Sequence, residues 1–253
     1  MPRLSLGLGV QTIRKGGGGA SFSPANISGL SLWLKADAGV TLSGSDVTAW
    51  ADQSGNGRNA SSADVNPTYN SSDLNSKPTI SLSSIVEGTN KSFQITGNPM
   101  GASGTTAFAV VYVGDVYNEG NDNGPIFGDF GIVNLSSHYP YGLNDSVYDG
   151  FASANRKGPL TAPSTITNSW SLYSVVSTQN DWRDYVNGAL MYSDNTNVYS
   201  NSPLETYLFI GSSGAFGYTL KGKIAEAITY NRVLTTGERQ QVEAYLNTKY
   251  AIY

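Results

Sequence analysis

The stretch GKIAEAITYNRVLTTGERQQVEAYLNTKY (residues 222–250) decides the fold, because it joins a strand pattern to a helix pattern. Lys223–Tyr230 reads as a strand. Thr235 and Glu238 then match a capping box, with Thr235 at the N-cap and Glu238 at N3. One apolar face at helical spacing follows, made by Val242, Tyr245, Leu246 and Tyr250. We therefore expect a strand followed by a single helix of about three to four turns.

Upstream of this stretch, the sequence reads as short strands between turn signals. Thr106–Val113 (TAFAVVYV) is nearly all apolar, as expected of a central strand buried on both faces. Asn187 and Gly188 form a strong hairpin signal. The other expected strands are Leu30–Ala36, Asp46–Ala51, Pro78–Leu82, Ser92–Thr96, Ile126–Phe130, Gly131–Leu135, Tyr139–Leu143, Val147–Ala152, Trp170–Thr178, Arg183–Val186, Ala189–Tyr192 and Tyr207–Gly211. This pattern predicts an all-β fold, a two-sheet antiparallel sandwich with one short C-terminal helix.

The composition limits the classes of function. The chain has 253 residues, which fits one sandwich domain, and only 13% are charged, about half the usual share. Lys and Arg number 15 against 19 Asp and Glu, without the basic cluster that nucleic-acid binding needs. With no Cys and one His, the sequence excludes disulfides, thiolate chemistry and multi-His metal sites. No apolar run reaches the roughly 18 residues of a membrane span.

Residues 1–27 differ from the rest and are expected to form an extended arm on a domain of residues 28–253. Apolar residues alternate with Ser and Gly at the strand period of two; they are Leu4, Leu6, Leu8 and Val10. A glycine run follows: Gly16, Gly17, Gly18 and Gly19. The alternation suits a strand added to the sheet edge of a neighbouring subunit, and the glycines would let the backbone pass through a narrow groove. The alternative is a flexible tail with a linker.

Four stretches carry a family resemblance: SLWLKADAGV (31–40), VTAWADQSGNGRNA (47–60), DYVNGALMY (184–192) and the closing stretch 222–250. They resemble the concanavalin A-like, laminin-G-like jelly-roll domains of bacterial and phage proteins, over residues 28–253. LSLGLGVQTIRKGGGG (4–19) is similar to the glycine-rich leaders of phage tail and fibre proteins. The resemblance implies a two-sheet antiparallel jelly roll whose concave face is where lectins and glucanases of this fold place sugar. The fold alone does not give the function.

A hydrolase of this family would resemble the laminarinase-type glucanases, which carry E-x-D-x-E on one strand. A retaining mechanism needs two carboxyls about 5–5.5 Å apart. The sequence has no E-x-D-x-E, and its acidic pairs at spacing four lie in turn-like segments: Asp115 with Glu119, and Asp145 with Asp149. His138 also lies in a turn-like segment, and no G-x-S-x-G elbow occurs. We therefore expect a protein that is not an enzyme.

Two acidic residues are candidate calcium ligands. Asp122 lies in EGNDNG (119–124), which resembles the start of an EF-hand loop but places Phe130 where that loop needs Glu. Asp52 lies in WADQSGNG (50–57), where it either binds calcium or accepts backbone N–H bonds from the turn that follows. We favour the turn role for Asp52. No cofactor is expected, and calcium is the one candidate metal.

Glycan binding needs aromatic faces for sugar rings, with amides or carboxylates nearby for the hydroxyls. The segments HYPYGLNDSVYDGF (138–151) and QNDWRD (179–184) supply such residues. The candidates are Tyr139, Tyr141, Asn144, Tyr148 and Trp182. The alternative is that these aromatics pack loops in a chain with 16 Tyr. Three further residues lie in strand patterns and are expected to pack in the core or on a sheet: Trp33, Trp50 and Trp170.

These observations lead to three hypotheses of different classes. The favoured one is a non-enzymatic component of a phage virion, in the tail, a fibre or the capsid surface, that displays a lectin-like domain through its arm. Its partners would be other virion proteins and further copies of itself. The second is a carbohydrate-binding module that recognises a host or bacterial surface polysaccharide. The third is a glycoside hydrolase. The first two are compatible, because an attachment protein does both.

Overall fold

The computed structural model describes residues 22–82, 91–114, 124–131, 137–141, 146–164, 166–203, 207–213 and 219–253. A short 3-10 turn, η1 (Pro24–Asn26), comes first. The strands are β1 (Leu30–Lys35), β2 (Val40–Ser43), β3 (Asp46–Trp50), β4 (Ala60–Ser62), β5 (Thr68–Leu74), β6 (Lys77–Ser81), β7 (Phe93–Ile95), β8 (Gly104–Val113), β9 (Phe127–Gly128), β10 (His138–Tyr141), β11 (Ser146–Asp149), β12 (Lys157–Thr161), β13 (Trp170–Thr178), β14 (Asp181–Val186), β15 (Ala189–Asp194), β16 (Leu208–Ile210) and β17 (Gly222–Tyr230). The helix α1 (Thr236–Tyr250) follows β17.

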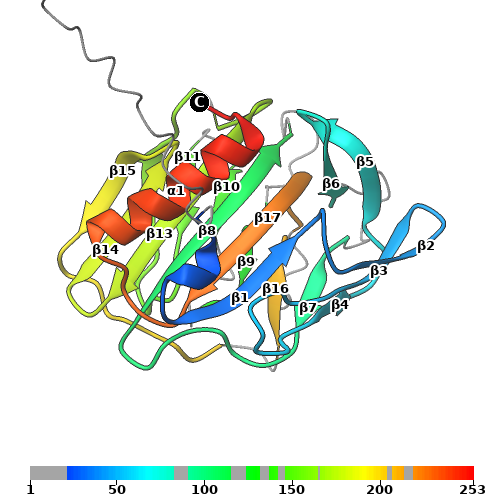
Figure 1. The fold of residues 1–253 in the computed structure, drawn as a ribbon. Helices are drawn as coiled ribbons and strands as arrows, with labels where there is room; N and C mark the ends of the chain where they lie inside the picture. The colour runs from blue at the N-terminus through cyan, green and yellow to red at the C-terminus, as the bar shows by residue number, and fades with distance from the viewer. Residues whose placement is uncertain are drawn as a thin grey trace, which may run out of the picture.

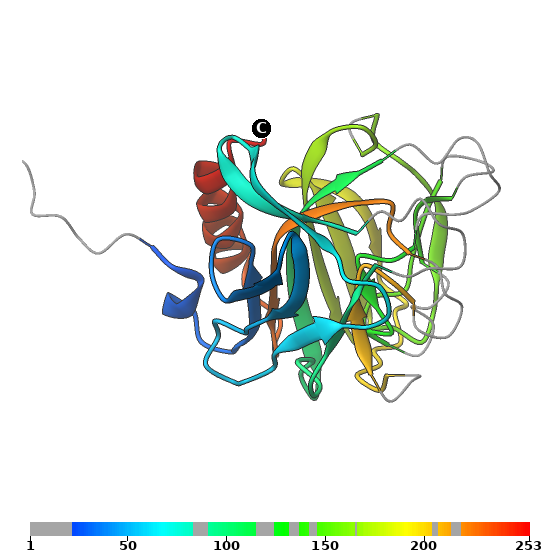
Figure 2. The same cartoon turned by 90° about the vertical axis from the view of Figure 1, so that its right-hand side faces the viewer.

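The strands form two packed layers (Figures 1 and 2). In the first layer, β15, β14, β13, β8 and β17 lie side by side, and α1 covers their outer face. The hydrogen-bonded path then runs through β6, β5, β3, β4, β7 and β16 to β9, which brings the sheet round into the second layer. A separate sheet of β10, β11 and β12 packs on the inner face of the first layer. The prediction of an all-β antiparallel sandwich with a C-terminal helix is confirmed.

Strand β8 lies at the centre of the first layer, paired with β13 on one edge and β17 on the other. Its residues alternate between two hydrophobic clusters, as strand geometry requires. Ala107, Ala109 and Val111 face the second layer, whereas Phe108 and Val110 face α1. Burial on both faces, expected from the TAFAVVYV pattern, is confirmed for this strand, and Tyr112 is its one half-exposed residue.

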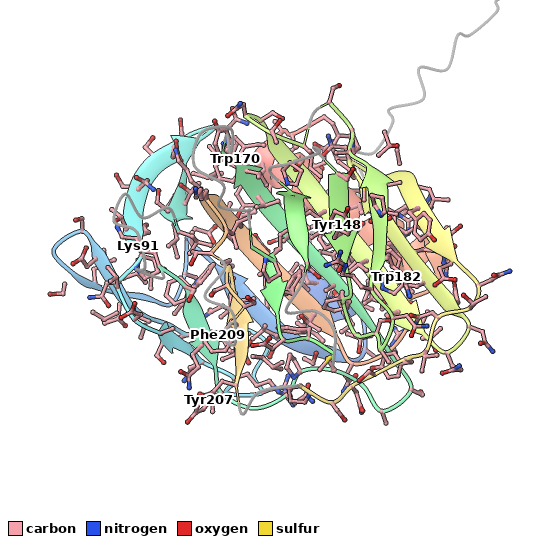
Figure 3. The ribbon with its side chains drawn as sticks, turned by 180° about the vertical axis from the view of Figure 1, so that it is seen from behind. Lys91, Tyr148, Trp170, Trp182, Tyr207 and Phe209 are labelled. Carbon is pink, nitrogen blue, oxygen red and sulfur yellow. The ribbon has the colours of Figure 1, made fainter. Side chains whose placement is uncertain are left out.

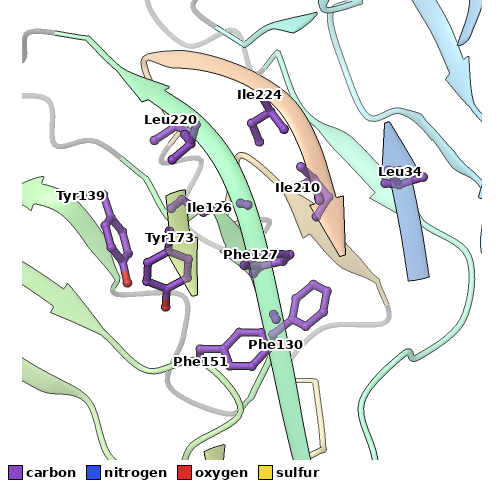
Figure 4. Packing of buried hydrophobic residues seen from close by; sticks show 14 of the residues in the cluster. Leu34, Ile126, Phe127, Phe130, Tyr139, Phe151, Tyr173, Ile210, Leu220 and Ile224 are labelled. Atoms are coloured by element: carbon purple, nitrogen blue, oxygen red, sulfur yellow. The ribbon is translucent and has the colours of Figure 1, made fainter. Parts of the chain in front are cut away.

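The core between the layers is dominated by aromatic rings (Figure 4). Phe127 lies against Phe130 and Phe151, with ring centroids 5.3 and 5.5 Å apart. At the other end of the second layer, Trp50 packs on Phe93 at 5.3 Å. Each of these rings is at most 2% exposed. At about 25 cal/mol per Å² of apolar area, such burial is the main force that holds the two layers together.

Helix α1 begins and ends as the sequence indicates. The Thr235 hydroxyl accepts a hydrogen bond from the backbone N–H of Glu238, and the Glu238 carboxylate accepts one from the backbone N–H of Thr235. Val242, Leu246 and Tyr250 are buried against the first layer. The predicted capping box and apolar face are therefore confirmed. The helix gains its stability from this buried face, because an isolated helix of this length is marginal.

The Glu226 carboxylate, fully buried on β17, fastens α1 to the first layer. It accepts hydrogen bonds from the Trp33 indole N–H at 2.6 Å and the Tyr250 hydroxyl at 2.9 Å. The Lys249 ammonium lies 2.8 Å from it and also contacts Asp37 at 2.9 Å. A buried carboxylate is tolerated because these donors replace the water it has lost.

The structure also contains strands that the sequence did not indicate: β2, β4, β5 and β12. The reason is visible in β5 (TYNSSDL), whose residues are mostly polar and of which only Leu74 is buried, so no apolar alternation marks it. Residues 22–27, assigned to the arm from sequence, pack on the sandwich: Ile27 is buried, and the Tyr230 hydroxyl donates to the Pro24 carbonyl. Residues 1–21, with the predicted anchoring residues Leu4 to Gly19, lie outside the described residues.

Substitution Glu226→Ala tests whether the Glu226 carboxylate fastens α1 to the first layer. Four donors would lose this acceptor, those of Trp33, Tyr245, Lys249 and Tyr250. We therefore expect the free energy of unfolding to fall by about 3–5 kcal/mol. Urea denaturation followed by circular dichroism measures this change.

The matched control is Asp181→Ala, which removes the partner of Arg183 in an ion pair whose side chains are 32% and 41% exposed. Exposed pairs contribute about 0–1 kcal/mol, so this variant should unfold nearly as the parent does. Equal losses in the two variants would contradict the anchoring role of Glu226.

Candidate functional site

Trp182, a predicted glycan-binding residue, lies in the interior. It belongs to β14 rather than to a turn, is 0% exposed, and its indole N–H donates to the Phe151 carbonyl at 3.0 Å. The turn comes just before it, at Asn180, whose φ is 61°. The sequence-based placement of Trp182 at an exposed turn is therefore wrong, because the strand starts at Asp181 and its alternation turns this ring toward the core.

Tyr139 is also in the interior, which contradicts the prediction that its ring is available to a glycan. It is 2% exposed and its ring lies 5.3 Å from that of Tyr173. Their hydroxyls (the two rings lie side by side in Figure 4) both donate to the Asp149 carboxylate. Asp149 thus lies on a strand, β11, and not in the turn-like stretch that the sequence suggested.

Tyr148 is the one predicted glycan-binding residue whose described side chain reaches the surface, on the outer side of β11 (Figure 3). The Arg156 guanidinium lies over its ring at 4.3 Å. The backbone of Gly158 passes beside the ring, where an added Cβ would lie 2.7 Å from Cδ1. Asn144 lies outside the described residues, as do the side chains of Tyr141 and His138.

Asp52 has the turn role favoured from sequence. Its carboxylate accepts hydrogen bonds from the backbone N–H groups of Ser54 and Arg58, at 2.9 and 3.0 Å, and from that of Trp33 at 2.9 Å. The second calcium candidate, Asp122, lies outside the described residues. Within the described ranges, no group of three or more acidic or His residues is placed to hold a metal ion.

Two carboxyls, Asp149 and Asp184, approach each other in the core between the layers. Burial raises the pKa of Asp149 to about 6, against the hydrogen bonds from Tyr173 and two backbone N–H groups. Burial also raises the pKa of Asp184 to about 8, and the charge of Asp149 adds to this rise. Neither carboxyl has an open path to a ligand, because the two residues are 2% and 0% exposed. The hydrogen bond from the Tyr173 hydroxyl to Asp149 joins β13 to β11.

A different set of side chains lies on the outer face of the first layer, beyond the C-terminal end of α1. One residue from each of five neighbouring strands contributes to it, and strand pairing places them in a line. We call this line the cross-strand row; its members are Trp170 (β13), Tyr112 (β8), Lys223 (β17), Ser81 (β6) and Thr68 (β5). All five side chains are half-exposed. The row thus presents a continuous surface to solvent.

Two aromatic rings form one end of the row. The rings of Trp170 and Tyr112 lie 5.8 Å apart at 57° to each other, and the Lys223 ammonium lies 5.7 Å from the Tyr112 centroid. The Tyr112 hydroxyl is 3.4 Å from the Asn168 side-chain oxygen. The rings are thus held in place by neighbours while both stay half-exposed, and a partly exposed ring can stack on a flat ligand.

Polar groups border the middle of the row. The Asp73 carboxylate is 2.9 Å from the Lys223 ammonium and accepts a hydrogen bond from the Thr79 hydroxyl at 2.7 Å. Burial opposes ionisation of Asp73, but these two donors outweigh it and hold its pKa below the ordinary value. The Asn70 amide donates to the Ser81 hydroxyl at 3.0 Å. A carboxylate, an amide and hydroxyls therefore border the two rings.

The row was not predicted from sequence. Trp170 was assigned to core or sheet packing together with Trp33 and Trp50; Trp50 is fully buried and Trp33 is 9% exposed, but Trp170 is half-exposed. The available signal was the pair Tyr112 and Lys223, whose polar ends interrupt otherwise apolar strands. That signal does not show that Tyr112, Trp170 and Lys223, which are 53 to 111 residues apart in sequence, come together in the sheet.

The fold is similar to several solved sandwich structures. No protein-family model and no curated protein sequence matches the chain. The binding domain of Paraclostridial Mosquitocidal Protein 1 has a TM-score of 0.59 at 16% identity, over 89% of this chain and 54% of that one. The sialidase of Trypanosoma rangeli in complex with sialic acid has 0.57 at 15%, over 88% and 33%. A GH54 α-L-arabinofuranosidase has 0.56 at 15%, over 81% and 51%.

At these identities the likeness shows a shared β-sandwich fold. The chain also spans only about half or one third of the length of these structures. Along the described ranges, no helix combines the length and the apolar character needed to cross a membrane.

The raised pKa values of the two interior carboxyls make stability depend on pH. An unfolded Asp ionises near pH 3.8, whereas folded Asp184 keeps its proton to about pH 8. Between pH 4 and pH 8 the unfolded state therefore releases protons that the folded state retains, so the free energy of unfolding falls as pH rises. We expect a fall on the order of a few kcal/mol, much smaller in Asp184→Asn.

Urea denaturation at pH 4, 6 and 8 measures this dependence. Asp181→Asn, on the same strand but exposed, should keep the pH dependence of the parent. A parent whose stability stays constant or rises over this range would contradict the assignment.

Proposed function

We propose that the protein is a non-catalytic carbohydrate-binding module that uses the cross-strand row to hold a polysaccharide. The observation that supports this most is the half-exposed pair of Trp170 and Tyr112, bordered by polar groups. The C–H faces of a sugar ring are apolar enough to stack on aromatic rings, while its hydroxyls need donors and acceptors alongside. Asp73, Asn70 and Ser81 supply these groups.

Recognition is favoured over hydrolysis by the position of the acidic residues. In most glycosidase families, retaining or inverting, two carboxyls flank the bond that is cleaved. Asp149 and Asp184, the carboxyls with raised pKa, are enclosed in the core, where a polysaccharide has no access. At the row, the Asp73 carboxylate is bound to Lys223 and its pKa is lowered, which is the opposite of what a general acid needs.

The sandwich fold gives this proposal further support. Among the similar structures are the binding domain of a mosquitocidal protein and two glycoside-processing enzymes. The outer face of a sheet is also a rigid base, which limits the ordering cost of binding an extended chain.

The place of the module in a phage virion, as a concanavalin A-like domain displayed by its arm, is part of the same proposal. Its support is in the sequence: the alternating Leu4, Leu6 and Leu8, the glycine run, and the resemblance of this leader to those of phage tail and fibre proteins. An arm that adds a strand to a neighbour would fix many copies on a particle. Many copies would multiply a weak affinity for surface polysaccharide through multivalency.

Trp170→Ala tests the site. We expect the affinity for a bound polysaccharide to fall about tenfold or more, because the substitution removes the indole on which a sugar ring stacks. A tenfold loss of affinity corresponds to about 1.4 kcal/mol of binding free energy. The measurement is a glycan array with the purified chain, followed by titration of the polymers that bind.

The matched control is Tyr207→Ala, which removes another exposed aromatic ring, 49% exposed and away from the row. It should leave the affinity unchanged. Equal effects of the two substitutions, or silence of the parent protein across bacterial polysaccharides, would contradict the proposal. Release of reducing ends from a polymer would favour the hydrolase alternative.

Deletion of residues 1–20 tests the arm. The interior contacts of the sandwich described above involve residues from Phe22 onward, so the truncated chain should stay folded and soluble. It should no longer join particles when it is supplied in place of the full chain, as judged by co-sedimentation. Normal incorporation of the truncated chain would contradict the anchoring role.

A further inference from the structure

The cross-strand row has a cationic end, and its chemistry indicates which polysaccharides it selects. Thr68, the last member of the row, accepts a hydrogen bond from the Lys91 ammonium at 3.0 Å. Lys91 precedes β7 and is half-exposed (Figure 3). The row therefore begins at Trp170, has the Lys223 ammonium in its middle, and ends at Thr68, which is bound by the Lys91 ammonium.

We infer that the ligand is an acidic polysaccharide, with sugar rings stacked on Trp170 and Tyr112 and sugar carboxylates bound by Lys223 and Lys91. This inference rests on the proposed function and adds the substrate class.

Among the described residues, each ammonium group has one hydrogen-bond acceptor, which leaves donors for a ligand. An ammonium has three N–H donors. Lys223 uses one toward Asp73 at 2.9 Å, and its side chain is 33% exposed. Lys91 uses one toward the Thr68 hydroxyl, which carries no charge to neutralise it. Both groups can therefore add a carboxylate without breaking the contacts that hold them in place.

The dimensions suit an extended polymer. Neighbouring strands lie about 4.8 Å apart, so the four steps from β13 to β5 place Trp170 about 19 Å from Thr68. A linear chain lying across the strands would pass the two rings first, then Lys223, then the Ser81 and Thr68 hydroxyls with Lys91. Stacking at one end and charge at the other would also fix the direction in which the chain lies.

The overall charge of the protein makes these two cations significant. The net charge is -4, and only 13% of residues are charged. A polyanion is therefore repelled by the molecule as a whole and binds only where positive groups are close at hand. The ammonium groups of Lys223 and Lys91 supply this local positive charge beside the two aromatic rings.

The test compares polymers that differ only in charge. The full chain is titrated with polygalacturonate and with the same polymer after reduction of its carboxyls to neutral alcohols; polysialate is a second source of sugar carboxylate. We expect at least tenfold tighter binding of one carboxylated polymer than of the neutral one at low salt. This preference should shrink as salt rises, because exposed charges are screened. Tighter binding of polysialate or of polygalacturonate identifies which sugar acid is the source.

Lys91→Gln and Lys223→Gln should each reduce the preference for the carboxylated polymer several-fold and leave affinity for the neutral polymer unchanged. The matched control is Arg183→Gln, which removes one positive charge from β14, on the far side of β13 from the row. It should leave the preference intact.

Three results would overturn the inference. The first is equal affinity for charged and neutral polymers; if that binding is still lost in Trp170→Ala, the proposed function stands and only the substrate class fails. The second is equal weakening of both polymers by Lys91→Gln, which would indicate a structural role. The third is a folded parent chain that binds none of these polymers, nor any other polysaccharide, in which case the proposed function fails as well.

Discussion

The constraint on which the rest of the structure depends is the double burial of β8. Both of its edges are hydrogen-bonded, to β13 and β17, and both of its faces are apolar. A sheet with such a strand needs a cover on each side. The second layer covers one face and α1 the other. Thr106 connects β8 to the segment that leads into α1. Its hydroxyl donates a hydrogen bond to the Arg232 carbonyl and accepts one from the backbone N–H of Leu234.

The helix is held by charge as well as by apolar packing. Glu226 beneath one end of α1 collects donors from β1 and from the helix itself. At the middle of the helix, Glu243 accepts a hydrogen bond from the Ser174 hydroxyl at 2.7 Å and pairs with Arg239, whose guanidinium lies 3.8 Å from the Tyr185 ring centroid. Apolar contact alone tolerates sliding, whereas these directed contacts are satisfied in one position only. They therefore fix where α1 ends and which part of the sheet it leaves open.

The sequence predicts the elements whose signals are local. The capping box at Thr235, the strand Trp170–Thr178 and the apolar β8 each carry their evidence within a few residues, and each is confirmed. Trp182 is placed wrongly from the sequence, because its polar neighbours indicate a turn, whereas burial is decided by the layer that packs above. The burial of Tyr139, which lies on an expected strand, has the same cause. The resemblance to concanavalin A-like domains and the arm of residues 1–21 stay predictions.

The cross-strand row could not be predicted because it results from a mismatch of lengths. Strand β8 has 10 residues and spans about 33 Å, whereas the 15-residue helix spans about 22 Å. A single helix therefore cannot cover the outer face of the first layer along its whole length. Apolar side chains at the uncovered end would leave an adhesive patch. Aromatic rings with polar partners can occupy such a position, because Tyr112 and Trp170 pack through one side and face water through the other. The short helix α1 thus completes the core over one part of the first layer and leaves a rigid, amphipathic surface on the part beyond its end.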